Sequence, residues 1–173
     1  MTKRRIEVVD YCQTWPQKFI DAKKEIAEVV GDNAVIIEHI GSTSVAGLSA
    51  KPIIDILLEV KSLSDLDAVS DSMSTIGFKP KGENGIEGRR YFQKGGNQRS
   101  HHLHAFESGH PCLDEHRAFK EYLIQRSDVS AQYDRVKRNA ARYCNHDSQY
   151  YMELKNDFIQ QCMVKALEFY STN

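Results

Sequence analysis

The sequence predicts an α/β (α+β) domain in which a mixed sheet of about five strands lies between an N-terminal helix and a helical C-terminal third. Three observations predict this class. Apolar residues recur at helical spacing near the N-terminus, short strand-like runs follow between residues 35 and 106, and no strand pattern occurs after residue 114. At 173 residues, with no repeat or linker, the chain is expected to form a single domain over residues 1–173.

The elements can be placed in order along the chain. Thr14 and Gln17 have the spacing of a capping box, which predicts that the first helix covers residues 14–30. Continuous β-branched runs predict two buried strands, and a helical pattern follows them. The expected ranges are 35–40 and 53–60 for these strands, 62–76 for the helix, and 78–81, 89–94 and 101–106 for three shorter strands. Three helices are expected after them, around residues 119–123, 133–143 and 151–169.

Composition excludes several classes of protein. The 23 Lys and Arg residues are balanced by 24 Asp and Glu residues, so no nucleic-acid partner is expected. No apolar run approaches the roughly 20 residues that a membrane span needs, and the N-terminus lacks the apolar stretch of a secretory signal. The four cysteines lie far apart, which argues against a disulfide framework or a cysteine zinc site. A cytoplasmic location with no membrane partner is expected, and the oligomeric state is left open.

One acid, Asp55, lies inside the apolar run of the second strand. Burying an unpaired carboxylate costs several kcal/mol, so this side chain is expected either to meet a cation or to sit at an open edge of the sheet. The alternative is a structural aspartate bonded to a lysine or a loop. The turn before this strand offers Gly41 and the hydroxyls of Ser42, Thr43 and Ser44, which suit a phosphate cradle but are also common in ordinary loops.

Histidines on the last strand offer further ligands. His102 and His104 are two residues apart, so they share one face of the strand while His101 points to the other. If this strand lies near Asp55, one carboxylate and two imidazoles would meet, a set that suits manganese, zinc or iron better than magnesium. The alternative is that the two imidazoles only line a polar cleft. His39 could join them. Three other histidines are expected at the surface: His110, His116 and His146.

Cationic side chains are needed if the ligand carries phosphates. Lys51 lies four residues before Asp55, and Arg89 and Arg90 open a strand, so one of these two arginines must point to each face. We predict that Arg90 contributes to phosphate binding. Lys155 interrupts the apolar stripe of the last helix, and we expect it to reach the cleft of Asp55, the alternative being that it extends to solvent along its apolar stem.

The motifs together resemble a known family. The segment IEHIGSTSVAGLSAKPIIDILLEV, with WPQKF before it and HLHAFESG, HRAFKEYL and YMELKNDFI after it, closely resembles the GrpB-like family of the nucleotidyltransferase superfamily, over roughly residues 8–167. The resemblance implies a nucleotidyltransferase-like fold in which a Gly-Ser turn holds nucleotide phosphates and strand carboxylates hold magnesium. Gly41 and Ser42 match the turn and Asp55 matches the first acid. The second acid of the superfamily pattern is missing, because position 57 is Leu57. Glu59 lies about 13 Å from Asp55 along a strand, too far to replace it.

These observations lead to a functional hypothesis. We expect a nucleotidyltransferase that binds a nucleoside triphosphate and a divalent metal, magnesium or manganese rather than zinc, and that acts on a small-molecule acceptor. Asp55, His102 and His104 are the expected metal ligands, with Asp55 and His104 catalytic. The expected phosphate ligands are Gly41, Ser42, Ser44, Lys51, Arg90 and Lys155. Two alternatives remain: a non-catalytic nucleotide or metabolite sensor on the same fold, and a metalloenzyme using Asp55, His102 and His104.

Overall fold

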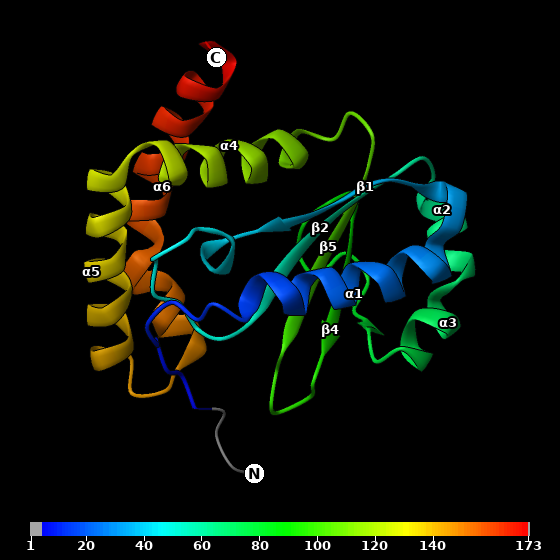
Figure 1. Cartoon of the computed structure of the whole chain (residues 1–173), viewed down its shortest axis with the longest axis horizontal. Coiled ribbons are helices and arrows are strands. Elements are labelled where there is room, and N and C mark those ends of the chain that lie inside the picture. Colours follow the sequence, from blue (N-terminus) through cyan, green and yellow to red (C-terminus); the bar gives the residue numbers. More distant parts are fainter. Residues whose placement is uncertain (1–4, 173) are drawn as a thin grey trace.

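A computed structural model describes residues 5–172, which form a mixed α/β structure (Figure 1). The helices are α1 (Trp15–Val30), α2 (Leu63–Ala68), α3 (Ser70–Thr75), α4 (Pro111–Gln125), α5 (Ser127–Tyr143) and α6 (Ser148–Thr172), with short 3-10 turns at Gly31–Asn33 and Ser42–Ser44. The strands are β1 (Ala34–Ile40), β2 (Ile54–Val60), β3 (Lys79–Pro80), β4 (Arg89–Lys94) and β5 (His101–Glu107). None of the described helices is both long and apolar enough to cross a bilayer.

The strands form one sheet in the order β1-β2-β5-β4-β3. Strands β2 and β5 are parallel, and the other neighbouring pairs are antiparallel. The parallel pairing places Asp55 opposite His102 and Leu57 opposite His104. On the other side of β2, Asp55 pairs with Ile40, the last residue of β1. The register therefore brings the acid, both histidines and the turn after β1 to one end of the sheet.

Helix α1 covers one face of the sheet. Its apolar stripe packs against alternate residues of β2 and β5 in a cluster that includes Trp15, Ala22, Ile26, Ile54, Ile56, Leu58 and Leu103. Because side chains alternate along a strand, Asp55, Leu57 and Glu59 face the opposite side. There Leu57 packs with Ile40, Phe106 and Leu113 under the start of α4. The acid of β2 therefore lies on the face that α1 leaves open.

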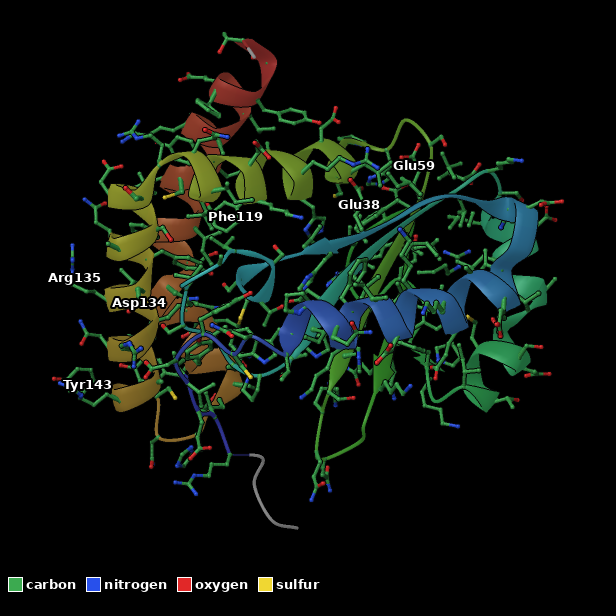
Figure 2. The ribbon with its side chains drawn as sticks, in the orientation of Figure 1. Glu38, Glu59, Phe119, Asp134, Arg135 and Tyr143 are labelled. Atoms are coloured by element: carbon green, nitrogen blue, oxygen red, sulfur yellow. The ribbon has the colours of Figure 1, made fainter. Side chains whose placement is uncertain are left out.

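The C-terminal helices pack mainly on one another and on the loop after β1 (Figure 1). Their apolar side chains form a cluster separate from that of the sheet, with Val45, Leu48, Ala118, Tyr122, Leu123, Val129, Tyr133, Cys162 and Ala166 as its buried members. An ionic contact also fastens α4 to the sheet. Arg117 binds Glu38 and Glu59 at 2.7 and 2.6 Å, at the place where Figure 2 labels the two glutamates. The Glu59 carboxylate is thus occupied by its ion pair with Arg117 of α4.

The predicted fold class is confirmed: a mixed five-stranded sheet follows an N-terminal helix and precedes a helical third. The predicted capping box is wrong, since Thr14 has helical dihedral angles and no side-chain capping bond, while Gln17 binds Asp21 instead. The helix predicted over residues 62–76 is two short helices, because Val69 departs from helical geometry at φ −106° and ψ 14°. The strand predicted at 78–81 shortens to Lys79–Pro80, although the Lys81 N–H still donates to the Tyr91 carbonyl at 2.8 Å.

Candidate functional site

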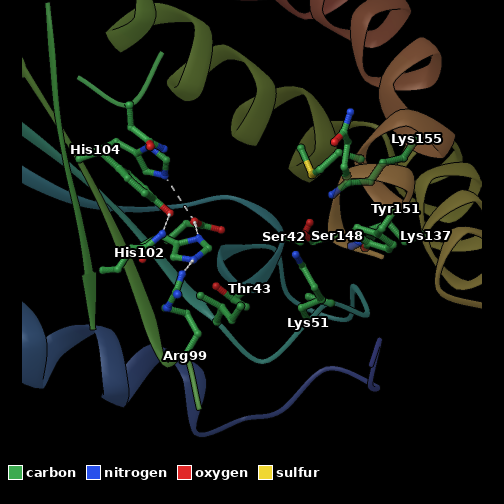
Figure 3. Close-up of a pocket in the computed structure, with 18 of the residues that line it drawn as sticks. Ser42, Thr43, Lys51, Arg99, His102, His104, Lys137, Ser148, Tyr151 and Lys155 are labelled. Atoms are coloured by element: carbon green, nitrogen blue, oxygen red, sulfur yellow. Dashed lines mark hydrogen bonds and ion pairs between the residues drawn. The ribbon is translucent and has the colours of Figure 1, made fainter. Parts of the chain in front are cut away.

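A cavity of about 550 Å³ lies between the open face of the sheet, the loop after β1 and helices α5 and α6 (Figure 3). Positively charged side chains far outnumber negatively charged ones along its wall. Among residues 5–172, one acidic residue, Asp55, lines it, whereas five cationic residues do so: Lys51, Arg89, Arg99, Lys137 and Lys155. Polar and aromatic residues complete the wall, among them Ser42, Thr43, Asn84, Tyr91, Gln93, His102, His104, Ser148, Gln149 and Tyr151. The cavity is therefore built to receive negative charge.

Asp55 lies between the two histidines that the strand spacing indicated. Nδ1 of His102 and Nε2 of His104 are each 3.5 Å from the same carboxylate oxygen, Oδ1. Burial alone would raise the pKa of Asp55, but hydrogen bonds from His102 and His104 hold this pKa well below its usual value. The side chain keeps 30% of its surface exposed. The structure thus places an ionised carboxylate in the cavity, fixed by one of its oxygens.

Gly41 has a specific steric role beside this carboxylate. Its φ of 72° lies in the left-handed region, and a Cβ built on it would lie 2.8 Å from Oδ2 of Asp55. Any side chain at position 41 would therefore displace the acid. The next residues diverge: Ser42 lines the cavity, whereas the Ser44 hydroxyl donates to the Gly41 carbonyl and Ser44 borders a different hollow. Ser44 was predicted to bind phosphate, but its hydroxyl is turned into its own turn and Ser44 does not line this cavity.

Two of the other histidines lie elsewhere than expected. His39 points to the α1 face, where it stacks on Phe19 and bonds Thr43, so it does not join the Asp55 group. His116 is not a surface residue. Its ring lies 5.2 Å from the ring of His104, and burial lowers its pKa to about 4. The spacing of His116 from Leu113 on the inner side of α4 is the signal that would have placed it there. His101 points away from the cavity, as predicted, toward Phe78.

Three lysines converge on the helical wall of the cavity (Figure 3). The ammonium groups of Lys51 and Lys155 lie 4.9 and 4.5 Å from the ring centre of Tyr151. Lys155 is only 8% exposed, and burial, together with the charge of Lys51, lowers its pKa to about 8. Burial and the nearby Lys155 lower the pKa of Lys137 to about 7. Keeping the lysines of this wall protonated therefore costs free energy, and a bound anion would offset that cost.

Sequence reasoning missed Lys137. This side chain is almost completely buried. Its ammonium donates to the Ser49 carbonyl and lies 4.5 Å from the ring centre of Tyr133. The periodicity of α5 contains the signal, because Lys137 lies four residues after Tyr133 and three before Ala140, both buried. The same argument identified Lys155 on the next helix.

Arg89 and not the predicted Arg90 lines the cavity from strand β4. Arg90 points to the other side of β4 and forms a two-pronged ion pair with Asp67, at 2.8 and 3.1 Å. Arg89 is 7% exposed and reaches the cavity with its guanidinium over the ring of Tyr91. Arg99, which the sequence analysis did not single out, enters from the turn between β4 and β5. Strand alternation left the choice between Arg89 and Arg90 open until the register was known.

The fit of a metal can be judged from the donors present. Among residues 5–172 no group of three or more His, Cys, Asp or Glu side chains is arranged to hold a metal ion. Asp55 nevertheless offers one carboxylate at the cavity surface. Magnesium is typically held by one or two carboxylates together with substrate phosphates and water. The donors therefore fit an ion shared between Asp55 and a phosphate ligand.

The chain resembles proteins of one family along most of its length. Residues 5–165 match the model of the family described as GrpB protein. The UPF0157 protein YqkA of Bacillus subtilis is 39% identical over 158 residues, which cover 91% of this chain and 46% of that protein. A UPF0157 protein of Halalkalibacterium halodurans is 33% identical over 163 residues, covering 93% and 82%. This chain thus spans about half the length of the first relative and most of the second.

A solved structure agrees with the sequence comparisons. The crystal structure of the conserved protein GrpB from Enterococcus faecalis matches with a TM-score of 0.90 at 34% identity, covering 95% of this chain and 99% of that one. Residues 5–165, which the family model matches, include the turn after β1, Asp55 and most of the C-terminal helices. The family resemblance predicted from the motifs is confirmed, and the chain belongs to the GrpB family.

Proposed function

We propose that this chain binds a nucleoside triphosphate with a magnesium or manganese ion in the cavity, in the cytoplasm, and transfers a nucleotidyl group to a small-molecule acceptor. One observation carries the proposal: among the residues that the structure describes, five cationic side chains and a single carboxylate line the same cavity. A triphosphate brings several negative charges in a chain, which suits cations spread over two walls. An uncharged metabolite would not offset the burial that lowers the pKa values of Lys137 and Lys155.

The residues divide the work between the two walls. Lys51, Lys137 and Lys155 hold phosphate oxygens on the helical side, each through a charge-assisted hydrogen bond. Asp55 stands on the sheet side, 3.5 Å from each imidazole, and is kept ionised there. A divalent cation at this carboxylate supplies charge neutralisation at the reacting phosphate. The side chains then keep the phosphates fixed while the acceptor enters, since such transfers depend mainly on positioning and electrostatics.

Position 57 supports a second candidate, a nucleotide or metabolite sensor that binds without turnover. Leu57 is fully buried among apolar side chains, so position 57, where the resemblance led us to expect a second acid, presents no carboxylate beside Asp55. A sensor would use the same cationic side chains to bind the triphosphate but would release no pyrophosphate. Pyrophosphate release in the presence of a mixture of small metabolites separates the two candidates.

The test is a thermal-shift panel of the four nucleoside triphosphates, each with and without magnesium or manganese. A ligand at about 100 times its Kd stabilises the folded state by about 2.7 kcal/mol. For a domain of this size that corresponds to a rise in Tm of roughly 5–10 °C. No rise with any triphosphate, under all metal conditions, would refute the proposal. A rise with inorganic sulfate as large as with triphosphates would show a general anion site instead.

Lys155→Met is expected to weaken triphosphate binding by about 1–3 kcal/mol, the scale of one charge-assisted hydrogen bond. Methionine keeps most of the apolar stem and removes a buried charge, so the variant should melt at or above the parent temperature. Isothermal titration calorimetry and thermal melting measure the two effects. Lys165→Met is the matched control, because Lys165 is exposed on the same helix and does not line the cavity. Equal affinity in both variants would remove Lys155 from the site.

Triphosphate affinity is expected to fall as the pH rises from 7 to 9. The pKa values of Lys137 and Lys155 lie near 7 and 8 in the free protein, below their ordinary value of 10.5, so both lose protons in this window. An anion favours the protonated lysines, and binding above pH 8 should take up protons, with about a tenfold loss per pH unit for each proton. Calorimetry in two buffers of different ionisation enthalpy measures the uptake.

The ligand-free fold should become more stable between pH 7 and 9, because the unfolded chain binds more protons than the folded chain in this window.

A further inference from the structure

Two arginines contact the histidines beside Asp55, each on the ring nitrogen that faces away from the acid. Nη1 of Arg99 lies 3.3 Å from Nε2 of His102. Nη1 of Arg89 lies 3.4 Å from Nδ1 of His104. The opposite nitrogen of each ring points at Oδ1 of Asp55. The five side chains therefore form one chain of contacts in the order arginine, histidine, aspartate, histidine, arginine.

The chemistry of these groups sets the direction of every hydrogen bond in this chain. A guanidinium has only donors and stays protonated, so the ring nitrogen that it contacts must offer a lone pair. A neutral imidazole that accepts at one nitrogen carries its proton on the other. His102 is then protonated at Nδ1 and His104 at Nε2, and both N–H groups donate to Asp55. A carboxylate accepts both without conflict.

The arginines are held in place by contacts other than ion pairs. Arg89 donates from Nε to the Glu83 carbonyl at 3.0 Å and from Nη2 to the Asn84 carbonyl at 2.7 Å, which leaves Nη1 directed at His104. Arg99 donates from Nε to the Gly96 carbonyl at 3.2 Å. Neither arginine forms a salt bridge with any acid among residues 5–172. Their position is thus set by loop carbonyls, and their charge is not consumed by a carboxylate.

We infer that Arg89 and Arg99 determine the metal specificity of this site by fixing the histidine tautomers, so that His102 and His104 position Asp55 and do not bind metal themselves. A metal ligand must present a lone pair. To turn a lone pair toward Asp55, each ring would have to place its N–H against the N–H of a guanidinium. The arginines therefore leave only carboxylate oxygen for a cation, which favours magnesium and disfavours zinc and iron.

This inference revises the predicted ligand set and removes the main support for a zinc or iron enzyme. It concerns the protein without nucleotide, so it stands or falls separately from the proposed function. It also gives His104 a positioning role in place of the predicted catalytic one, since the nitrogen nearest Asp55 carries a proton. The ring of His116 lies 5.2 Å from this ring.

Nitrogen-15 NMR of the histidine-labelled protein at pH 7.5 tests the tautomers directly. We expect His104 to be protonated at Nε2 and unprotonated at Nδ1, and His102 to show the reverse. The resonances are assigned with His102→Gln and His104→Gln samples. The opposite tautomer at either ring, or a doubly protonated ring, would overturn the inference. This measurement uses the unaltered protein, so it does not depend on whether a variant folds.

Metal titration tests the specificity. Zinc or cobalt(II) alone should bind weakly to the parent, without changing the two histidine resonances. Arg99→Met and Arg89→Met should each tighten zinc binding at least tenfold and bring the released imidazole into the cobalt spectrum. Arg90→Met is the matched control, because Arg90 lies on the same strand and pairs with Asp67 outside the cavity. Zinc binding by the parent that is as tight as in the variants, with shifted histidine resonances, would refute the inference.

Discussion

Leu57→Asp is expected to lower the free energy of unfolding by about 4 kcal/mol or more, the scale of an uncompensated buried charge. Leu57 has no exposed surface and packs with Ile40, Phe106 and Leu113. The side chains that form this cluster with it are apolar and offer a new carboxylate no hydrogen bond. The substitution supplies an acid at the position where the resemblance led us to expect one, yet it places the charge under α4 and outside the residues that line the cavity. Urea unfolding of both proteins measures the loss.

Leu57→Met is the control for this experiment. It keeps apolar character and nearly the same volume, so it should cost less than about 1.5 kcal/mol. If Leu57→Asp instead retained the parental stability and bound magnesium more tightly, position 57 would open to the cavity. The strand would then be able to hold two adjacent acids, and the argument for a sensor would lose its basis.

Asp55→Asn is expected to change metal-dependent and metal-free binding in opposite directions. Without the carboxylate, magnesium should no longer enhance triphosphate binding. In the absence of metal, however, the triphosphate should bind more tightly, by about tenfold, because contact repulsion between like charges near a surface is worth on the order of 1–4 kcal/mol. Asparagine can still accept a hydrogen bond from one or both imidazoles, so the fold should survive with a loss of about 1–2 kcal/mol.

Calorimetry with and without magnesium measures both arms of this prediction. Asp67→Asn makes the same chemical change at an aspartate that pairs with Arg90 away from the cavity, and it should leave binding unchanged. Magnesium enhancement that persisted in Asp55→Asn would show that another group holds the ion. An unfolded Asp55→Asn variant would show that the acid is required mainly for structure.

Sequence patterns predicted the parts of the fold that depend on local periodicity. The helix predicted over residues 14–30 is α1, the run at 53–60 contains β2, and the strand at 101–106 lies within β5. The break at Val69 was not predicted, because the apolar spacing of residues 63–76 fits one continuous helix. The non-helical dihedral angles of Val69 divide this segment into two helices, and apolar spacing carries no information about dihedral angles.

The candidate site was predicted where one strand alone decides the geometry. Two-residue spacing placed His102 and His104 on one face, and a parallel pairing with β2 then brought both to Asp55. The choice between Arg89 and Arg90 depends on how β4 is paired with β5, and the sequence alone does not give this register. Lys137 and His116 were missed for another reason. Lys137 is buried and His116 is half-buried on the inner sides of amphipathic helices, where their polarity argued for the surface and their spacing argued for the interior.

The sheet and the C-terminal helices have separate apolar clusters, and this division has a consequence for local unfolding. Residues that share a cluster tend to open together, so the two parts are expected to behave as distinct cooperative units in amide hydrogen exchange. The cavity takes Asp55 from one unit and Lys137 and Lys155 from the other. A ligand that contacts both walls is lost when either unit opens. Its binding free energy is therefore added to the cost of each local opening, and the loaded domain should exchange its protected amides as a single unit.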